Sequence, residues 1–259
     1  MLEAYFDESE RDSGAFAVAG YGFAPEQARA FDREWREMLG PISAFHMTDV
    51  CARKREFKHF TRADSDSLIA RAVEIVTKYI SVAVAFSCNR TEFEAGAVDL
   101  RGIREPYSYL CHLCMQEIGN WMRDVGDDGG VAYVFEAGHQ FSGEASDLMQ
   151  LAAGFQEIGT LYCYNSHSFK SKNDSTPLHA ADLLAWEWTK YRDETVDRTI
   201  RDTRKSLGAL WDTSKYRVRH LTGEKLQMLY EPMRQMREMD GIEATWQEML
   251  NTRRAAQEG

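Results

Sequence analysis

The sequence predicts an α/β fold in which strands alternate with helices after an opening hairpin. Residues 2–7 and 15–23 are strand-like apolar runs, and the short segment between them is rich in Ser, Asp and Gly. Further along the chain, short apolar runs alternate with stretches whose apolar residues recur at helical spacing. This order favours an α/β sandwich with a mixed sheet over a purely doubly wound parallel sheet.

Strands and helices are then predicted in turn along the chain. Pro25 opens the first helix, because proline suits a first helical turn, and the 45–49 segment is interpreted as a loop or short strand. Residues 165–176 are polar and are interpreted as a loop. The remaining predicted strands are 81–88, 131–135 and 160–164, and the remaining predicted helices are 64–80, 106–125, 143–158 and one that starts at Pro177.

The length of the chain suits one large domain. Residues 1–192 contain all the predicted strands, whereas residues 193–259 are mostly charged and helical in pattern. We therefore expect a domain over 1–192 and a helical C-terminal extension, 193–259, packed on the same domain. The C-terminal helices could also form a homodimer.

Composition limits the class of protein. The 259 residues are 44% hydrophobic and 28% charged, as in ordinary folded proteins. Five cysteines without framework spacing indicate a reducing compartment, and the N-terminus has no signal-peptide pattern. No apolar run approaches the ~20 residues that a bilayer requires. The sequence thus predicts a cytoplasmic protein that does not cross a membrane.

The net charge of −10 works against a strongly basic nucleic-acid-binding surface. Local basic clusters exist nevertheless, such as Arg53, Lys54, Arg55 and Lys58, although a solvated face explains most clusters of this kind. Walker, Rossmann, nucleophile-elbow and HExxH motifs are missing from the sequence, so nucleotide-driven functions and those hydrolase classes lack support.

Three carboxylates stand at the ends of separate apolar segments. Asp7 and Glu136 end strand-like runs, and Asp182 lies one turn into the helix that Pro177 opens. If the strands pair, these acids converge, and converged carboxylates repel unless a cation holds them. A divalent metal ion is the usual solution, which points to metal-assisted phosphodiester chemistry.

Two neighbours of these acids are also candidates for a catalytic role. His179 shares a helical stripe with Asp182, so it could orient water, contact phosphate or pack half-buried. Glu8 follows Asp7 and points to the opposite face of an extended strand, so both reach one ion only if the strand bends. Glu8 could otherwise bind a second ion or cap the turn.

The motifs YFDES, FHMTD, an acidic strand end at Glu136 and PLHAADLLAW occur in this order. In combination they resemble the domain of unknown function 3800 family over roughly residues 1–190. That resemblance implies a ribonuclease H-like fold and a metal-dependent nuclease with two Mg²⁺ or Mn²⁺ ions held by Asp7, Glu136 and Asp182. His179 replaces a Gln that is usual in the family, and Glu136 replaces a common Asp.

The resemblance also raises His46 and Asp49 as accessory residues that close one side of the cleft. His139 and Lys170 are weaker candidates, for acid catalysis and phosphate contact. Two functions stay open at this point. One is a nuclease that acts on DNA or RNA. The other is a catalytically inactive ribonuclease H-like binding or assembly module of a mobile-element or phage-defence system.

Overall fold

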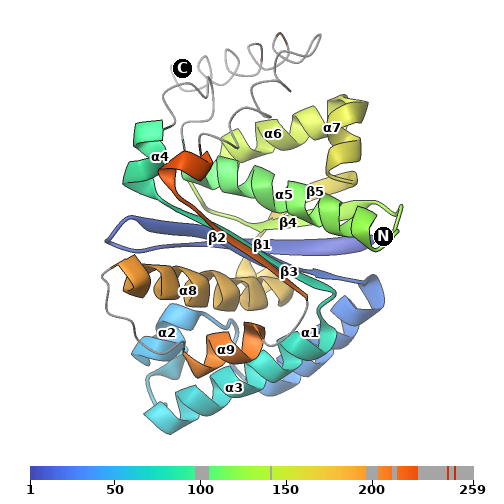
Figure 1. Ribbon diagram of the computed structural model, residues 1–259. Helices are drawn as coiled ribbons and strands as arrows, with labels where there is room; N and C mark the ends of the chain where they lie inside the picture. The colour runs from blue at the N-terminus through green and yellow to red at the C-terminus, as the bar shows by residue number, and fades with distance from the viewer. Residues whose placement is uncertain are drawn as a thin grey trace, which may run out of the picture.

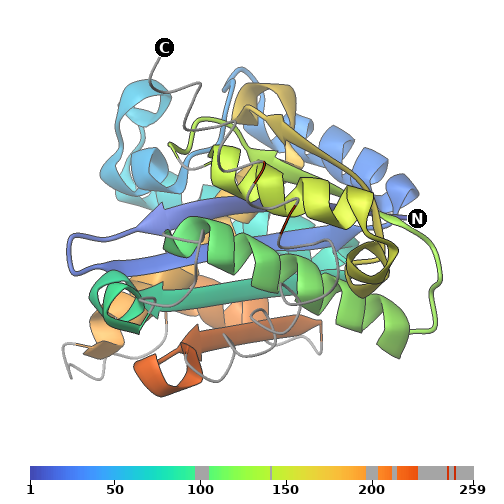
Figure 2. The same ribbon diagram turned by 90° about the horizontal axis from the view of Figure 1, so that it is seen from above.

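In the computed structural model, the described residues form a six-stranded mixed sheet with helices on both faces (Figure 1). The strands lie in the order β5-β4-β1-β2-β3-β6, and Figure 2 shows them side by side from above. The structure describes residues 1–96, 105–140, 142–196, 204–211 and 215–226, together with Ala244 and Glu248.

The predicted opening hairpin and mixed sheet are confirmed. β1, β2 and β3 are antiparallel neighbours, whereas β4 runs parallel to β1, β5 parallel to β4, and β6 parallel to β3. The strands are β1 (Leu2–Glu10), β2 (Ala15–Phe23), β3 (Val82–Asn89), β4 (Val131–Glu136), β5 (Tyr164–Lys170) and β6 (Tyr216–Leu221). Because β1 and β4 are parallel neighbours, their carboxyl ends meet at one edge of the sheet.

The helices form two layers, and a hydrophobic core lies between each layer and the sheet. Helices α4 to α7 cover one face; α1, α2, α3, α8 and α9 lie on the other (Figure 1). The helical elements are α1 (Pro25–Leu39), α2 (Met47–Ala52), η1 (Arg55–Phe57), α3 (Arg62–Tyr79), α4 (Arg90–Gly96), α5 (Pro106–Asp124), α6 (Ser142–Gly154), α7 (Gln156–Leu161), η3 (Lys172–Asp174), α8 (Pro177–Val196) and α9 (Lys205–Trp211).

The pleat of β1 decides which way its acidic end points. Phe6 packs in the core on the α5 side, and Tyr5 packs in the core on the α8 side. Successive side chains alternate between faces, so Asp7 is directed toward α8. In β4, Val134 lies on the α8 side and Phe135 on the α5 side, which directs Glu136 to the same face as Asp7.

Two predicted boundaries are wrong around β5. The segment predicted as a strand at 160–164 is the end of α7 and a turn, and the strand instead occupies Tyr164–Lys170, inside the predicted loop. β5 is an edge strand with largely solvent-accessible side chains, so its sequence is polar and lacks a strand pattern. The 45–49 segment likewise enters a helix, α2, at Met47.

The C-terminal part is not purely helical. Tyr216–Leu221 form β6, which pairs with β3, so part of the predicted extension belongs to the sheet. β6 is also an edge strand, and its half-buried, charged side chains hide the strand pattern. The helices predicted beyond Leu226, including those expected to form a dimer, fall largely outside the described residues. Among the described helices, none is long and apolar enough for a membrane crossing.

Candidate metal centre

Asp7 and Glu136 lie next to each other at the carboxyl ends of two neighbouring strands. Phe6 pairs with Phe135 in the β1–β4 register, and their rings stack at 5.3 Å, which places the following acids side by side. Asp7 is buried, with 2% of its surface exposed, and Glu136 is partly buried. The predicted strand ends thus deliver both carboxylates to one place.

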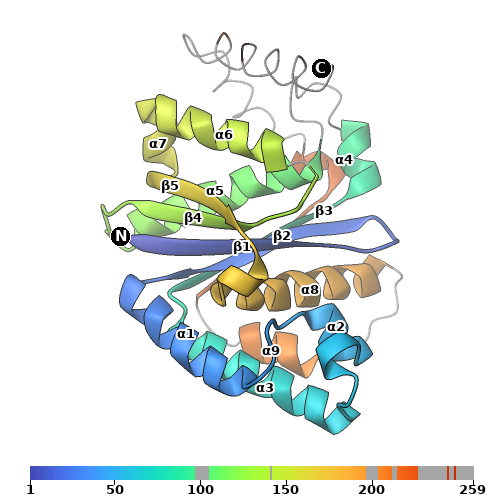
Figure 3. The ribbon, with the colours of Figure 1, turned by 180° about the vertical axis from the view of Figure 1, so that it is seen from behind.

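Asp182 approaches the same place from helix α8, which lies across β1 and β2 on this face of the sheet (Figure 3). Residues 177–189 of α8 are all buried between the sheet and the outer helices, and Asp182 among them is 6% exposed. One oxygen, Oδ2, accepts a hydrogen bond of 2.6 Å from the backbone N–H of Met47. Asp182 therefore holds the N-terminal end of α2 as well as facing the other acids.

A lysine that sequence reasoning did not select joins the three acids. The Nζ atom of Lys172 lies 2.7 Å from Asp7 Oδ2, 2.8 Å from Asp182 Oδ1 and 3.7 Å from Glu136 Oε1. Lys172 itself is 8% exposed. Its sequence signal is weak, because it stands in the polar segment 165–176, which the sequence predicts to be a loop.

Three of the acids can offer ligand atoms to one metal ion. One carboxylate oxygen each from Asp7, Glu8 and Glu136 lie within 4.8 Å of one another. Glu8 follows the paired part of the β1–β4 ladder, which ends at Phe6, and its carboxylate nevertheless comes close to that of Asp7. Oxygen-only donors of this kind suit a hard divalent cation.

One oxygen of these three acids has no hydrogen-bond partner among the described residues and is available to bind such a cation. Glu8 Oε2 is buried and accepts no hydrogen bond from any described residue. A buried carboxylate oxygen without a donor is costly, and a cation would relieve that cost. Asp7 and Asp182 both have a partner on each oxygen. The Glu8 N–H and Lys172 contact Oδ1 and Oδ2 of Asp7. Asp182 has Met47 on Oδ2, and Lys172 and His46 on Oδ1.

Burial and crowding shift the protonation of the acids. Burial raises the pKa of Asp7 well above its usual value; Lys172 opposes this, while Asp182, Glu8 and Glu136 add to it. Burial, followed by the charge of Glu136, raises the pKa of Glu8 to about 7, with Lys172 lowering it. The cluster therefore takes up protons near neutral pH, and a bound cation would compete with them.

Lys172 stays charged in this surrounding. Burial alone would lower its pKa, but the nearby carboxylates of Asp182, Asp7 and Glu136 together raise it above the usual lysine value. The protein therefore places a permanent positive charge among these acids.

His179 lies directly behind this lysine. Its Nδ1 accepts a hydrogen bond of 2.9 Å from Trp35 Nε1, and its Nε2 lies 2.9 Å from the backbone carbonyl oxygen of Lys172. Since an indole N–H only donates and a carbonyl only accepts, the neutral ring must carry its proton on Nε2. Burial lowers the pKa of His179 to about 4, in agreement with a neutral ring. The geometry gives His179 a positioning role, with neither ring nitrogen left for substrate.

The accessory candidates lie at different distances from the cluster. His46 is in place beside it, with Nδ1 3.2 Å from Asp182 Oδ1, and Asp49 in α2 pairs with Arg55 Nε at 3.5 Å. His139 stacks on Tyr107 with 3.9 Å between ring centroids, within the layer of α5 on the other face of the sheet. Lys170 is the β5 register partner of Glu136, and its side chain is exposed.

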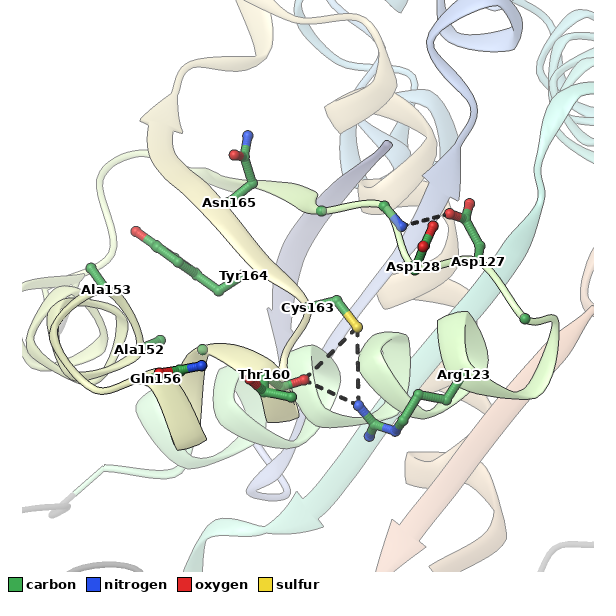
Figure 4. Close-up of a pocket in the computed structure, with 14 residues that line it drawn as sticks. Arg123, Asp127, Asp128, Ala152, Ala153, Gln156, Thr160, Cys163, Tyr164 and Asn165 are labelled. Atoms are coloured by element: carbon green, nitrogen blue, oxygen red, sulfur yellow. Dashed lines mark hydrogen bonds between the residues drawn. The ribbon is translucent and has the colours of Figure 1, made fainter.

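One cavity of the described structure lies away from the acids. It measures about 870 Å³ and is lined by the turn before β4 and the start of β5, at the opposite end of these strands from the acids (Figure 4). Two of its charged side chains are already paired: Arg123 donates to the carbonyls of Thr160 and Leu161, and Asp127 accepts from the Gly129 N–H. None of the acids of the cluster lines this cavity.

Comparison with known proteins identifies no relative. The chain matches no protein-family model, and no curated protein is significantly similar to it in sequence. The function of the cluster has to follow from its own geometry.

Proposed function

We propose that the protein is a metal-dependent phosphodiester hydrolase, a nuclease, whose site is the cluster of Asp7, Glu8 and Glu136 with Asp182 beside it. One observation carries the proposal: three carboxylates from the ends of two neighbouring strands bring oxygens within 4.8 Å of one another. Carboxylates crowded at a buried strand end repel one another, and a bound cation would relieve that repulsion. Mg²⁺ or Mn²⁺ is the ion that such oxygen ligands favour.

The sheet supports a ribonuclease H-like assignment. β1, β2 and β3 form an antiparallel unit, with α1 to α3 between β2 and β3 in the chain, and β4 and β5 add parallel strands on the other side of β1. Asp7 on the central β1, Glu136 on its parallel neighbour and Asp182 on a late helix agree with the order of acids in the domain of unknown function 3800 family. The family assignment is part of the proposal.

The residues of the cluster would have different roles in catalysis. Asp7, Glu8 and Glu136 would hold the ion, and the ion would polarise the phosphodiester and lower the pKa of its bound water. Asp182 and Lys172 would keep Asp7 in place through the contacts described above. The resemblance implies two ions.

Nucleic acid is the proposed substrate, although the net charge of the chain is −10. A basic segment follows α2, the helix whose first N–H is held by Asp182. Arg53, Lys54, Arg55 and Lys58 are all exposed there. Such a segment next to the acids would contact phosphates on either side of the one that is cleaved.

Single substitutions at the cluster test the proposal. Asp7→Asn and Glu136→Gln should each lower Mn²⁺- or Mg²⁺-dependent cleavage of labelled DNA and RNA oligonucleotides by at least ~100-fold, the upper end of what the loss of a supporting group around a metal costs. Asp12→Asn, an exposed acid in the β1–β2 turn, is the matched control and should cleave normally. Metal-dependent cleavage that is equal in all four proteins would refute the assignment.

The internal lysine favours the second candidate function, an inactive binding or assembly module. Lys172 already supplies positive charge to Asp7 and Asp182, so the fold can tolerate the acids without an ion. If this is the function, Mn²⁺ at millimolar concentration will leave the melting temperature unchanged. A nuclease centre would instead be stabilised by mass action as the ion binds.

A further inference from the structure

Hydrogen bonds to its backbone hold Lys172 in position beside the acids. It lies in η3, on the short connection that leads from the edge strand β5 to α8 (Figure 3). Its carbonyl oxygen accepts from His179, and His179 in turn accepts from the buried Trp35. Three elements, η3, α8 and α1, thus fix the point from which the lysine side chain reaches the acids. A lysine held this way is part of the site.

The ammonium group bridges two particular acids. Its distances to Asp7 and Asp182 are 2.7 and 2.8 Å, whereas its distance to Glu136 is 3.7 Å. The ammonium therefore lies on the Asp7–Asp182 side of the cluster. The oxygens that can share one metal ion lie on the other side, on Asp7, Glu8 and Glu136. Asp7 belongs to both sets.

Asp182 has three partners and is not in the group of acids that can share one ion. Oδ2 accepts the Met47 N–H at 2.6 Å, and Oδ1 contacts both Lys172 at 2.8 Å and His46 at 3.2 Å. Asp7 also has a partner on each oxygen, the Glu8 N–H on Oδ1 and Lys172 on Oδ2, but it belongs to that group with Glu8 and Glu136. The resemblance gave Asp182 the role of a ligand, and this geometry instead makes it the residue that holds the lysine and the start of α2.

We propose that Lys172 takes the place of the second ion, so that the centre binds one divalent ion on Asp7, Glu8 and Glu136 and uses the lysine ammonium as its fixed second cation. The inference rests on the proposed function, because it assumes that the acids bind a metal at all. The ammonium faces the shared ligand Asp7, where it can also oppose the charge of a phosphate bound to the ion. Such a centre would not need a second metal ion to neutralise the charge of its substrate.

Ion counting tests the inference without any assay of cleavage. Equilibrium dialysis against Mn²⁺, with metal and protein both quantified, should give one ion per wild-type chain and one per Lys172→Arg chain. Lys172→Met frees Asp182 and should raise the count to two. Lys78→Met is the matched control: it removes a lysine that pairs with a carboxylate, Glu34, away from the cluster, and should leave the count at one.

Two tightly bound ions in the wild-type protein would overturn the inference while leaving the proposed function in place. No bound ion in the wild-type protein would overturn the proposed function, and this inference with it. If Lys172→Met does not fold, as judged by circular dichroism, the wild-type and Lys172→Arg counts still decide. A Lys172→Met protein that folds and binds one ion would show that the ammonium does not occupy an ion position.

Discussion

Replacing Glu8 by glutamine should remove much of the pH dependence of stability in the metal-free protein. Burial and the charge of Glu136 raise the pKa of Glu8 from 4.5 to about 7 in the folded state. Between these two values the folded protein keeps a proton that the unfolded chain has released. The stability that Glu8 contributes is therefore fully present below about pH 4.5 and is lost as the pH rises through about 7.

The size of the effect follows from the shift. Each pKa unit corresponds to ~1.4 kcal/mol of free energy. The rise in the pKa of Glu8 therefore limits the loss in the free energy of unfolding, as the pH rises through about 7, to about 3 kcal/mol. A glutamine of the same shape carries no charge at any pH and does not lose this stability. For a chain of this size the difference at pH 8 corresponds to a melting temperature higher by on the order of 5–10 °C in the variant.

Thermal unfolding followed by circular dichroism, in chelator and between about pH 5 and about pH 8, measures this difference. Glu94→Gln removes an exposed carboxylate in α4 and serves as the control, whose curve should follow the wild type. Equal losses of melting temperature in wild type and Glu8→Gln would show that Glu8 is not the group that titrates. With Mn²⁺ present, the wild-type loss should shrink, because the ion favours the ionised acid.

Two substitutions test the support of the site. His179→Ala leaves the buried Trp35 N–H and the Lys172 carbonyl without partners and should lower the free energy of unfolding by ~2–4 kcal/mol in urea titrations; a loss within error would argue against the positioning role. Gly20→Ala would put a Cβ 1.8 Å from the Tyr5 carbonyl oxygen, so a folded variant with wild-type circular dichroism and melting temperature would contradict this packing.

Most of the framework could be predicted from local pattern. The runs that became β1, β2, β3 and β4 are buried, so they had to be apolar, and the pattern showed it. The edge strands β5 and β6 were missed because each has one free side, where polar side chains are tolerated. α2 was missed because it spans only six residues, Met47–Ala52, too few to show a helical period.

For the candidate site, Asp7, Glu136 and Asp182 could be chosen because each ends or interrupts an apolar run. That signal is local, since an acid inside a buried segment needs a reason to be there. Lys172 carries no such signal. Lys172 is buried because its partners come from β1, β4 and α8, and no spacing of residues along the chain predicts these contacts.

His179 shows the same limit in another way. Its helical spacing to Asp182 correctly put the two residues on neighbouring positions of α8, but spacing could not say which groups would take its ring nitrogens. Trp35, from a helix far away in sequence, fixes one nitrogen, and the Lys172 carbonyl fixes the other. The tautomer and the role of this histidine are therefore tertiary properties.

The sequence by itself determined the buried strands β1 to β4, the opening hairpin and the three acids at the ends of buried segments, because burial restricts which residues each position accepts. The tertiary structure alone decided that an ammonium group lies between Asp7 and Asp182, and that an oxygen of Glu8 lies within 4.8 Å of oxygens of Asp7 and Glu136. The physical reason is that Coulomb interactions depend on distance in space, and those distances exist only once the sheet and α8 have come together.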